Sequence, residues 1–251
     1  MRRFIILMLA GMLILVCAFA RTGVAGDLSV KDILEHADRS RGNVAGIIWD
    51  IKITAVEGSS KESRGLTVKV KKNNTLARYV SPPNVSDRMV LMLDRNMWFI
   101  RSGLSKPVSI SPRQKLLGDA ANGDIASTNY AEDYKARLSG EESVNGELCY
   151  VLDLKAANTN VTYDRIKYWV SKQRIVGVKA EFYTISGKLF KSAEFKYANR
   201  VRINDKTEIP FISELLIRDT VQADKATTLD YSNIRVHDIP DSAFNINVLL
   251  K

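Results

Sequence analysis

The sequence predicts a mainly β protein with a few helices, built on one long antiparallel sheet, and three observations support this class. From Val44 onward, apolar residues recur at every second position, which is the period of a half-buried strand. About ten or eleven such segments follow one another, and most connections between them are shorter than the dozen or more residues that parallel crossovers need. A sheet of this size rarely stays flat, so we expect it to curl into a barrel or part of one.

A short helix is predicted before the strands, over residues 29–40. Ser29 and Asp32 have the spacing of a capping box, and Ile33, Leu34 and Ala37 share one helical face.

The first strands follow directly. Ile47, Trp49, Ile51 and Ile53 share one strand face, and residues 66–71 repeat this alternation. The segments "TLARYV", "RMVLML" and "MWFIRS" continue the series, the last two as a hairpin.

The second half of the chain reads as a meander that begins at a hairpin turn. Asn145-Gly146 favours a type I′ turn, and residues 148–155 alternate after it. Pro240 and Asp241 suit a terminal turn or short helix. The remaining strands are predicted in "DRIKYWVSK", "IVGVKAEFYT", "KLFKSAEFKYA", "FISELLIRD" and "ATTLDYSNIRV".

Two neighbouring strands are apolar on both faces. Met89 and Leu91 alternate with Val90 and Met92, and residues 97–100 are apolar throughout. We expect one face to meet a helix or a ligand while the other packs elsewhere. A Met-rich wall suits a pocket that accepts varied chains, and ordinary core filling is the alternative interpretation.

The N-terminus has the order of a secretory signal peptide. Arg2 and Arg3 precede an apolar run, and small residues follow. We expect cleavage after Ala25 or Ala20, with an uncleaved anchor as the alternative. The predicted organisation is a signal peptide over residues 1–25, which directs export, and a single domain over residues 26–251.

The predicted mature chain is only mildly basic and has one cysteine. Residues 1–25 contain three arginines and no acid, so 37 basic and 28 acidic residues become 34 and 28, about +6. Cys149 is then the only cysteine, which excludes an internal disulfide and a cysteine-rich metal site. A basic patch around Lys69 and Lys71 fits a solvated face or anionic lipid head groups, and export argues against nucleic acid.

Recognised enzyme signatures are missing from the sequence. His36 and His237 are its two histidines, and it contains no nucleophile elbow, zinc-protease motif or phosphate-binding loop. The acidic residues of segment 116–134, "LLGDAANGDIASTNYAEDY", lack the order of a calcium loop. We therefore expect no catalytic site, no metal and no cofactor; an exported hydrolase with an unrecognised site is the remaining enzymatic alternative.

Several segments, taken together and in order, resemble the outer membrane lipoprotein-sorting family, the LolA-like group. They are "RMVLMLDRNMWFI", "ISPRQKLLGDAANGDIASTNYAEDY", "VNGELCYVLDLKA", "VTYDRIKYWVSK", "VKAEFYTISGKLFK" and "IPDSAFNINVLLK". The resemblance implies an incomplete, half β-barrel whose concave face is covered by short helices and encloses an apolar cavity for acyl chains. It also implies that residues 112–134 form the cover and are not an active site.

This resemblance implies a periplasmic carrier that moves the acyl chains of a lipoprotein or lipid between membranes. Its expected partners are an inner-membrane transporter and an outer-membrane acceptor, and the carrier is expected to be a monomer. A sensor or accessory module for an inner-membrane partner, such as an exporter of the resistance-nodulation-division (RND) type, is the alternative function. The residues expected to line the cavity or cover are Trp49, Met89, Leu91, Trp98, Ile100, Leu117, Ile125, Tyr130, Trp169 and Phe182.

Overall fold

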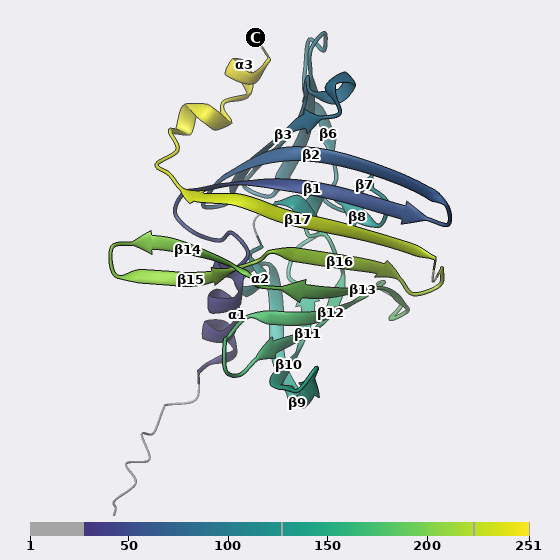
Figure 1. Ribbon diagram of the computed structural model, residues 1–251, viewed down its shortest axis with the longest axis vertical. Coiled ribbons are helices and arrows are strands. Elements are labelled where there is room, and N and C mark those ends of the chain that lie inside the picture. Colours follow the sequence, from purple (N-terminus) through teal and green to yellow (C-terminus); the bar gives the residue numbers. More distant parts are fainter. Residues whose placement is uncertain (1–27, 127, 223, 251) are drawn as a thin grey trace, which may run out of the picture.

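The computed structural model describes residues 28–126, 128–222 and 224–250; the predicted signal peptide lies outside them. Within these residues, 13 antiparallel strands form one curved sheet (Figure 1). In chain order they are β1 (Ile47–Glu57), β2 (Ser60–Lys71), β3 (Asn74–Ser81), β4 (Arg88–Leu93), β5 (Asn96–Arg101), β6 (Val108–Ile110), β9 (Tyr134–Val144), β10 (Glu147–Ala156), β11 (Arg165–Ser171), β12 (Gly177–Tyr183), β13 (Leu189–Lys196), β16 (Glu214–Asp219) and β17 (Lys225–Val236).

The other elements are short. Two small hairpins and six helices lie beside the sheet in the described part of the chain. They are α1 (Val30–Arg39), η1 (Pro83–Val85), β7 (Lys115–Leu117), β8 (Ala120–Ala121), η2 (Asn122–Ile125), α2 (Tyr130–Asp133), β14 (Asn199–Asn204), β15 (Thr207–Phe211), η3 (Asp241–Phe244) and α3 (Ile246–Leu249).

Strand β17 joins the two halves of the sheet. Strand β17 pairs with β1 on one side and with β16 on the other, giving the order β6-β5-β4-β3-β2-β1-β17-β16-β13-β12-β11-β10-β9. Strands β6 and β9 are the two edges, and the sheet stays open between them. The architecture is therefore the mainly β, incomplete barrel that the sequence predicted.

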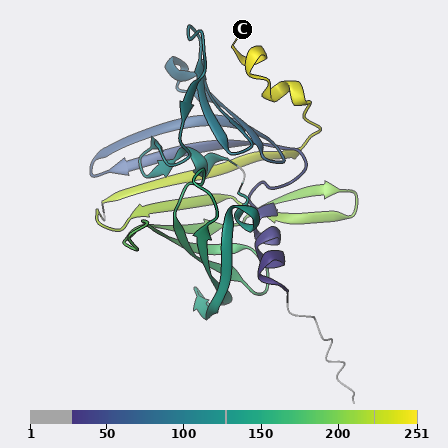
Figure 2. The ribbon, with the colours of Figure 1, turned by 180° about the vertical axis from the view of Figure 1, so that it is seen from behind.

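One face of the sheet, called here the inner face, carries α1 and the chain from β7 to α2 (Figure 2). The described residues of segment 112–134 lie across this face and are called here the cover. The sequence-predicted helix is confirmed as α1, because the Ser29 hydroxyl accepts a hydrogen bond from the Asp32 N–H and the Asp32 carboxylate accepts one from the Ser29 N–H.

The main core fills the space between the inner face and these elements. Ile33 and Leu34 of α1 and Ile125 of the cover are at most 2% exposed and belong to the same cluster as Ile53 and Val68 of the sheet. Burial of these side chains provides the dominant favourable contribution to folding. The core thus lies where the expected ligand cavity would have to open.

The C-terminal segment packs on part of the opposite, outer face, against strands β1, β3, β4 and β5. Ile239 and Phe244 are each 2% exposed and pack against Met89, Leu91 and Ile100. The Lys71 ammonium secures this segment: it donates a hydrogen bond to the Ile239 carbonyl and pairs with the Asp241 carboxylate, each at 2.8 Å. The strands predicted to be apolar on both faces are therefore sandwiched between two apolar layers.

The number of strands in the main sheet exceeds the ten or eleven expected. Strand β9 was missed because it is an edge strand with mostly exposed residues, so its sequence "YKARLSGEESV" shows no alternation. Strand β6 was also missed, because it has only three residues and none of them is buried. The type I′ turn is confirmed, since Asn145 and Gly146 have φ of 49° and 84°.

Candidate functional site

The candidate site is the interface between the cover and the inner face. Leu117 and Ile125 project from the cover into the main core, and Leu116 and Tyr130 pack at its border. The cover is bonded to β17 where the Thr227 hydroxyl accepts a hydrogen bond of 2.7 Å from the Asp119 N–H. Segment 116–134 is thus placed as the sequence predicted, across the inner face.

Aromatic side chains form much of the inner surface beneath the cover. The Trp49 and Phe211 rings lie 5.7 Å apart, and the Tyr163 and Phe182 rings stack at 3.8 Å. Of the residues nominated from the sequence, Trp49, Leu117, Ile125 and Phe182 are in the main core, with Tyr130 packed against it. These five therefore face the main core, on the same side of the sheet as the cover.

The other five nominated residues lie on the outer face, which corrects their expected orientation. Met89, Leu91 and Ile100 belong to the separate cluster beneath the C-terminal segment. Trp98 is opposite Leu91 in the register of β4 and β5, so it shares that face. Trp169 packs in a third cluster, with Cys149 and Val151.

The physical reason for this error is the two-residue period of a strand. Val90, the neighbour of Met89 and Leu91, is in the main core, as is Met97 beside Trp98. Where both faces are apolar, the pattern does not say which face meets the cover. Trp169 has a further reason: its indole N–H donates to the Glu142 carboxylate at 2.8 Å, which fixes it on the outer surface.

Helix α2 is attached to the rest of the molecule by polar contacts at both ends. The Asp38 carboxylate of α1 accepts a hydrogen bond of 2.9 Å from the Ala131 N–H. Arg95, in the turn between β4 and β5, pairs with Asp133 and, at 3.1 Å, with Glu132. These contacts reach α2 from two elements that are distant in the sequence.

Further polar contacts attach the remainder of the cover. Arg113 pairs with Asp164 at 2.7 Å and donates to the Val161 carbonyl at 3.0 Å. The Asn129 amide donates to the Asn73 side chain at 3.2 Å, in the turn between β2 and β3. Exposed or half-exposed contacts of this kind contribute about 1 kcal/mol or less each. The cover is therefore held chiefly by its apolar underside.

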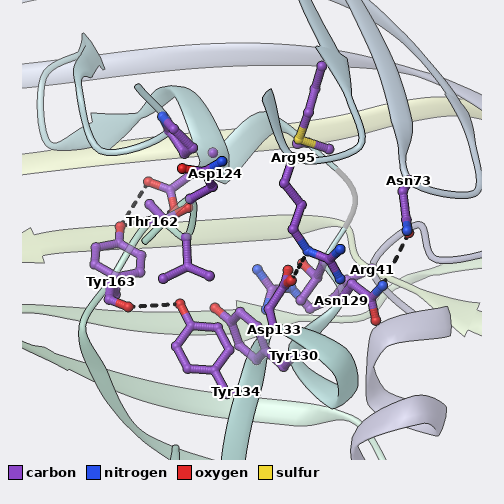
Figure 3. A pocket seen from close by; sticks show the side chains of 17 residues that line it. Arg41, Asn73, Arg95, Asp124, Asn129, Tyr130, Asp133, Tyr134, Thr162 and Tyr163 are labelled. Carbon is purple, nitrogen blue, oxygen red and sulfur yellow. Dashed lines mark hydrogen bonds and ion pairs between the residues drawn. The ribbon is translucent and has the colours of Figure 1, made fainter. Parts of the chain in front are cut away.

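A small cavity of about 60 Å³ lies between the cover and the sheet (Figure 3). Its walls carry both charged and aromatic side chains. They include Arg41, Arg95, Asp124, Asp133, Tyr130, Tyr134 and Tyr163. This volume accommodates a few water molecules or a small polar group and is too small for an acyl chain.

Buried carboxylates and phenols surround this cavity. The Tyr163 hydroxyl donates to the Asp124 carboxylate at 3.0 Å, and the Tyr134 hydroxyl donates to the Tyr163 carbonyl at 3.1 Å. Burial raises the pKa of Asp124 above its ordinary value, and it raises the pKa of Tyr163 and Tyr134 as well. Desolvation is the leading cause in each case.

Sequence reasoning missed two charged residues at this site, Asp38 and Arg41. Asp38 is 0% exposed and Arg41 is 8% exposed. A signal existed for Asp38, because it follows Leu34 by four residues on the stripe of α1 that faces the core. Arg41 lies beyond the end of α1 and had no such signal. A charged residue on such a stripe indicates a buried polar contact.

The described residues contain no cluster of three or more His, Cys, Asp or Glu side chains that could hold a metal ion. Within those same residues, no helix is long and apolar enough to cross a membrane.

Solved structures with this fold come from several bacteria. A LolA superfamily protein from Nitrosomonas europaea is 29% identical, with a TM-score of 0.79 over 88% of this chain and 99% of that one. A putative outer membrane lipoprotein-sorting protein domain from Vibrio parahaemolyticus is 20% identical (TM-score 0.74, 87% and 97% covered). A DUF1329 family protein from Desulfovibrio piger is also 20% identical (TM-score 0.73, 87% and 97%).

The similarity to these structures, together with the open sheet and its cover, identifies this chain as a LolA-like protein. A family model described as "Uncharacterized protein" matches residues 71–251, and the chain belongs to that family. No curated protein matches the chain.

Proposed function

We propose that this protein is a periplasmic carrier that binds the acyl chains of a lipoprotein or lipid between the cover and the inner face and moves them between membranes. The observation that carries the proposal is the chemistry of this interface. Leu117 and Ile125 of the cover are buried in the main core, and the ion pairs of Arg95 and Arg113 that hold the cover are partly exposed. Water can therefore replace these ion pairs when the cover separates from the sheet.

The driving force for capture follows from the hydrophobic effect. Each buried methylene contributes about 0.8 kcal/mol, so a chain of about a dozen methylenes gains on the order of 10 kcal/mol. In the closed state, Leu117 and Ile125 occupy the position that such a chain would take. Ligand and cover therefore compete for one apolar surface, and release occurs when a partner favours the closed state.

Delivery requires a donor and an acceptor, and we propose an inner-membrane transporter and an outer-membrane acceptor for these roles. The signal-like N-terminus supports export to the periplasm. The name of the Vibrio parahaemolyticus domain, which refers to lipoprotein sorting, supports the same assignment. In this proposal the protein performs no catalytic step, works as a single domain and acts as a monomer.

The deciding experiment is native mass spectrometry of the mature protein purified from the periplasm of expressing cells, with lipid extraction of any bound species. We expect a stoichiometric acylated ligand, and uptake of a fluorescent fatty acid once that ligand is removed. A ligand-free mass together with no uptake would refute the carrier proposal and favour the sensor alternative.

A further inference from the structure

Arg41 occupies an unusual position for a charged residue. It follows α1 and is 8% exposed, and its guanidinium lies between two aromatic rings: the Tyr130 ring of the cover at 5.2 Å and the Phe195 ring of β13 at 4.6 Å. It also lines the cavity beneath the cover (Figure 3). A fixed positive charge therefore lies at the boundary between cover and sheet.

No acidic partner neutralises this charge at close range. Arg41 takes part in none of the ion pairs formed by the described residues, and its Nη1 has no hydrogen-bond partner among them. A buried charge without an ionic partner is strongly unfavourable, so buried arginines are normally paired. A hydrogen bond with the Tyr130 hydroxyl and the two aromatic rings compensate only in part.

Other orphaned polar atoms are buried in the same region. Asp38 Oδ1 and the Tyr168 and Tyr197 hydroxyls have no hydrogen-bond partner within the described chain. All three groups interact electrostatically with Arg41. Asp38 is a poor counter-charge, because burial raises its pKa to about 7. A cluster of unpaired buried polar groups of this kind indicates a binding site for a polar group.

We infer that Arg41 binds the anionic head group of the acyl ligand, through carboxylate or phosphate oxygens that enter the cavity beneath the cover. The inference rests on the proposed function and narrows its substrate class to acidic lipids. The cavity of about 60 Å³ accommodates a small head group, while the acyl chain of the ligand binds at the apolar interface between cover and sheet. Nη1 provides a free donor, and guanidinium groups bind such oxygens with charge-assisted hydrogen bonds.

Matched ligands test this inference on the mature protein. Dodecanoate, dodecyl phosphate and dodecanol share one chain and differ in the head group, and each is titrated against a bound neutral apolar fluorophore. We expect at least one acidic ligand to bind about tenfold more tightly than the alcohol, as a charge-assisted hydrogen bond allows. The acid that shows the preference distinguishes a carboxylate from a phosphate head group.

Variants then assign the preference to Arg41. R41Q should lose the preference for the acid and keep the affinity for dodecanol, and R41K should keep part of the preference. The matched control is R39Q, because Arg39 is exposed two residues away and should leave both affinities unchanged. If R41Q retains the full preference for the acid, Arg41 is not the head-group ligand.

The outcomes separate this inference from the proposed function. Equal affinity of the unaltered protein for acids and alcohol would overturn the inference and leave the carrier proposal standing. Failure of all three ligands to bind would overturn both. If R41Q does not fold, side-chain NMR of arginine in the unaltered protein replaces it: an arginine signal should shift with the acid and not with dodecanol, and no such difference would overturn the inference.

Discussion

Asp38 of α1 caps helix α2: its Oδ2 accepts a hydrogen bond of 2.9 Å from the backbone N–H of Ala131. Asn129, at the N-cap position of α2, makes no such contact with the helix, so the cap comes from another helix. Asp38 is 0% exposed, and burial raises its pKa to about 7 despite this hydrogen bond. An attachment point of the cover therefore titrates near neutral pH.

The first prediction concerns the pH dependence of stability. The pKa of Asp38 in the folded protein lies above its unfolded value of 3.8. The favourable contribution of Asp38 to stability is therefore fully present below pH 3.8 and is lost as the pH rises through about 7. D38N has no such titration. The free energy of unfolding of D38N, relative to the unaltered protein, should rise by on the order of 4 kcal/mol between about pH 4 and pH 8.

Urea unfolding across this pH range measures the difference. The control is D87N, because Asp87 is exposed in the turn before β4. A difference between D38N and the unaltered protein that stays constant with pH would mean that Asp38 is ionised throughout.

The second prediction concerns the rate at which the cover opens. Arg95 holds α2 through Asp133 and Glu132, and R95Q removes both pairs. Because these groups are partly exposed, we expect stability to fall by about 1 kcal/mol or less. Uptake of a neutral apolar fluorophore, followed by stopped-flow fluorescence, should become several-fold faster.

R200Q is the matched control for Arg95. Arg200 pairs with Glu208 at 3.6 Å in the hairpin β14–β15, which projects away from the sheet (Figure 1). If the two variants take up the fluorophore at the same rate, the ion pairs of Arg95 do not limit opening.

The third prediction concerns the turn between β7 and β8, within the cover. Gly118 has φ of 54°, and a Cβ there would contact the Thr227 hydroxyl and lie 2.6 Å from Ala55 Cβ. G118A should therefore combine backbone strain with a clash against β1 and β17, and destabilise by about 2 to 4 kcal/mol. Thermal unfolding measures this effect.

G103A separates the two causes. Gly103 also has a positive φ, of 82°, but a Cβ there would meet nothing within 4 Å. We expect a cost of about 1 kcal/mol for this variant. Equal destabilisation by G103A and G118A would show that the close approach of the cover to β1 and β17 adds nothing to the destabilisation by G118A.

Local patterns determined how much of this structure was predictable. The capping box at Ser29 and the alternation from Ile47 to Ile53 predicted α1 and β1, because both signals depend on neighbours in the sequence. The orientation of Met89 was not predictable, since the C-terminal segment that covers it is more than a hundred residues away. The pairing of Asp38 with the cover depends on the same kind of distant contact.

The last prediction distinguishes the two faces of the sheet. Leu91 is 0% exposed under the C-terminal segment, and Leu117 is 5% exposed on the underside of the cover. L91A and L117A each remove a buried leucine, so each should destabilise by about 2 to 5 kcal/mol. Only L117A alters the surface for which ligand and cover compete. We therefore expect L117A to change the dissociation rate of a bound fluorescent fatty acid several-fold, while L91A leaves it within about twofold. The reverse result, with a faster rate in L91A alone, would place the ligand on the outer face beneath the C-terminal segment.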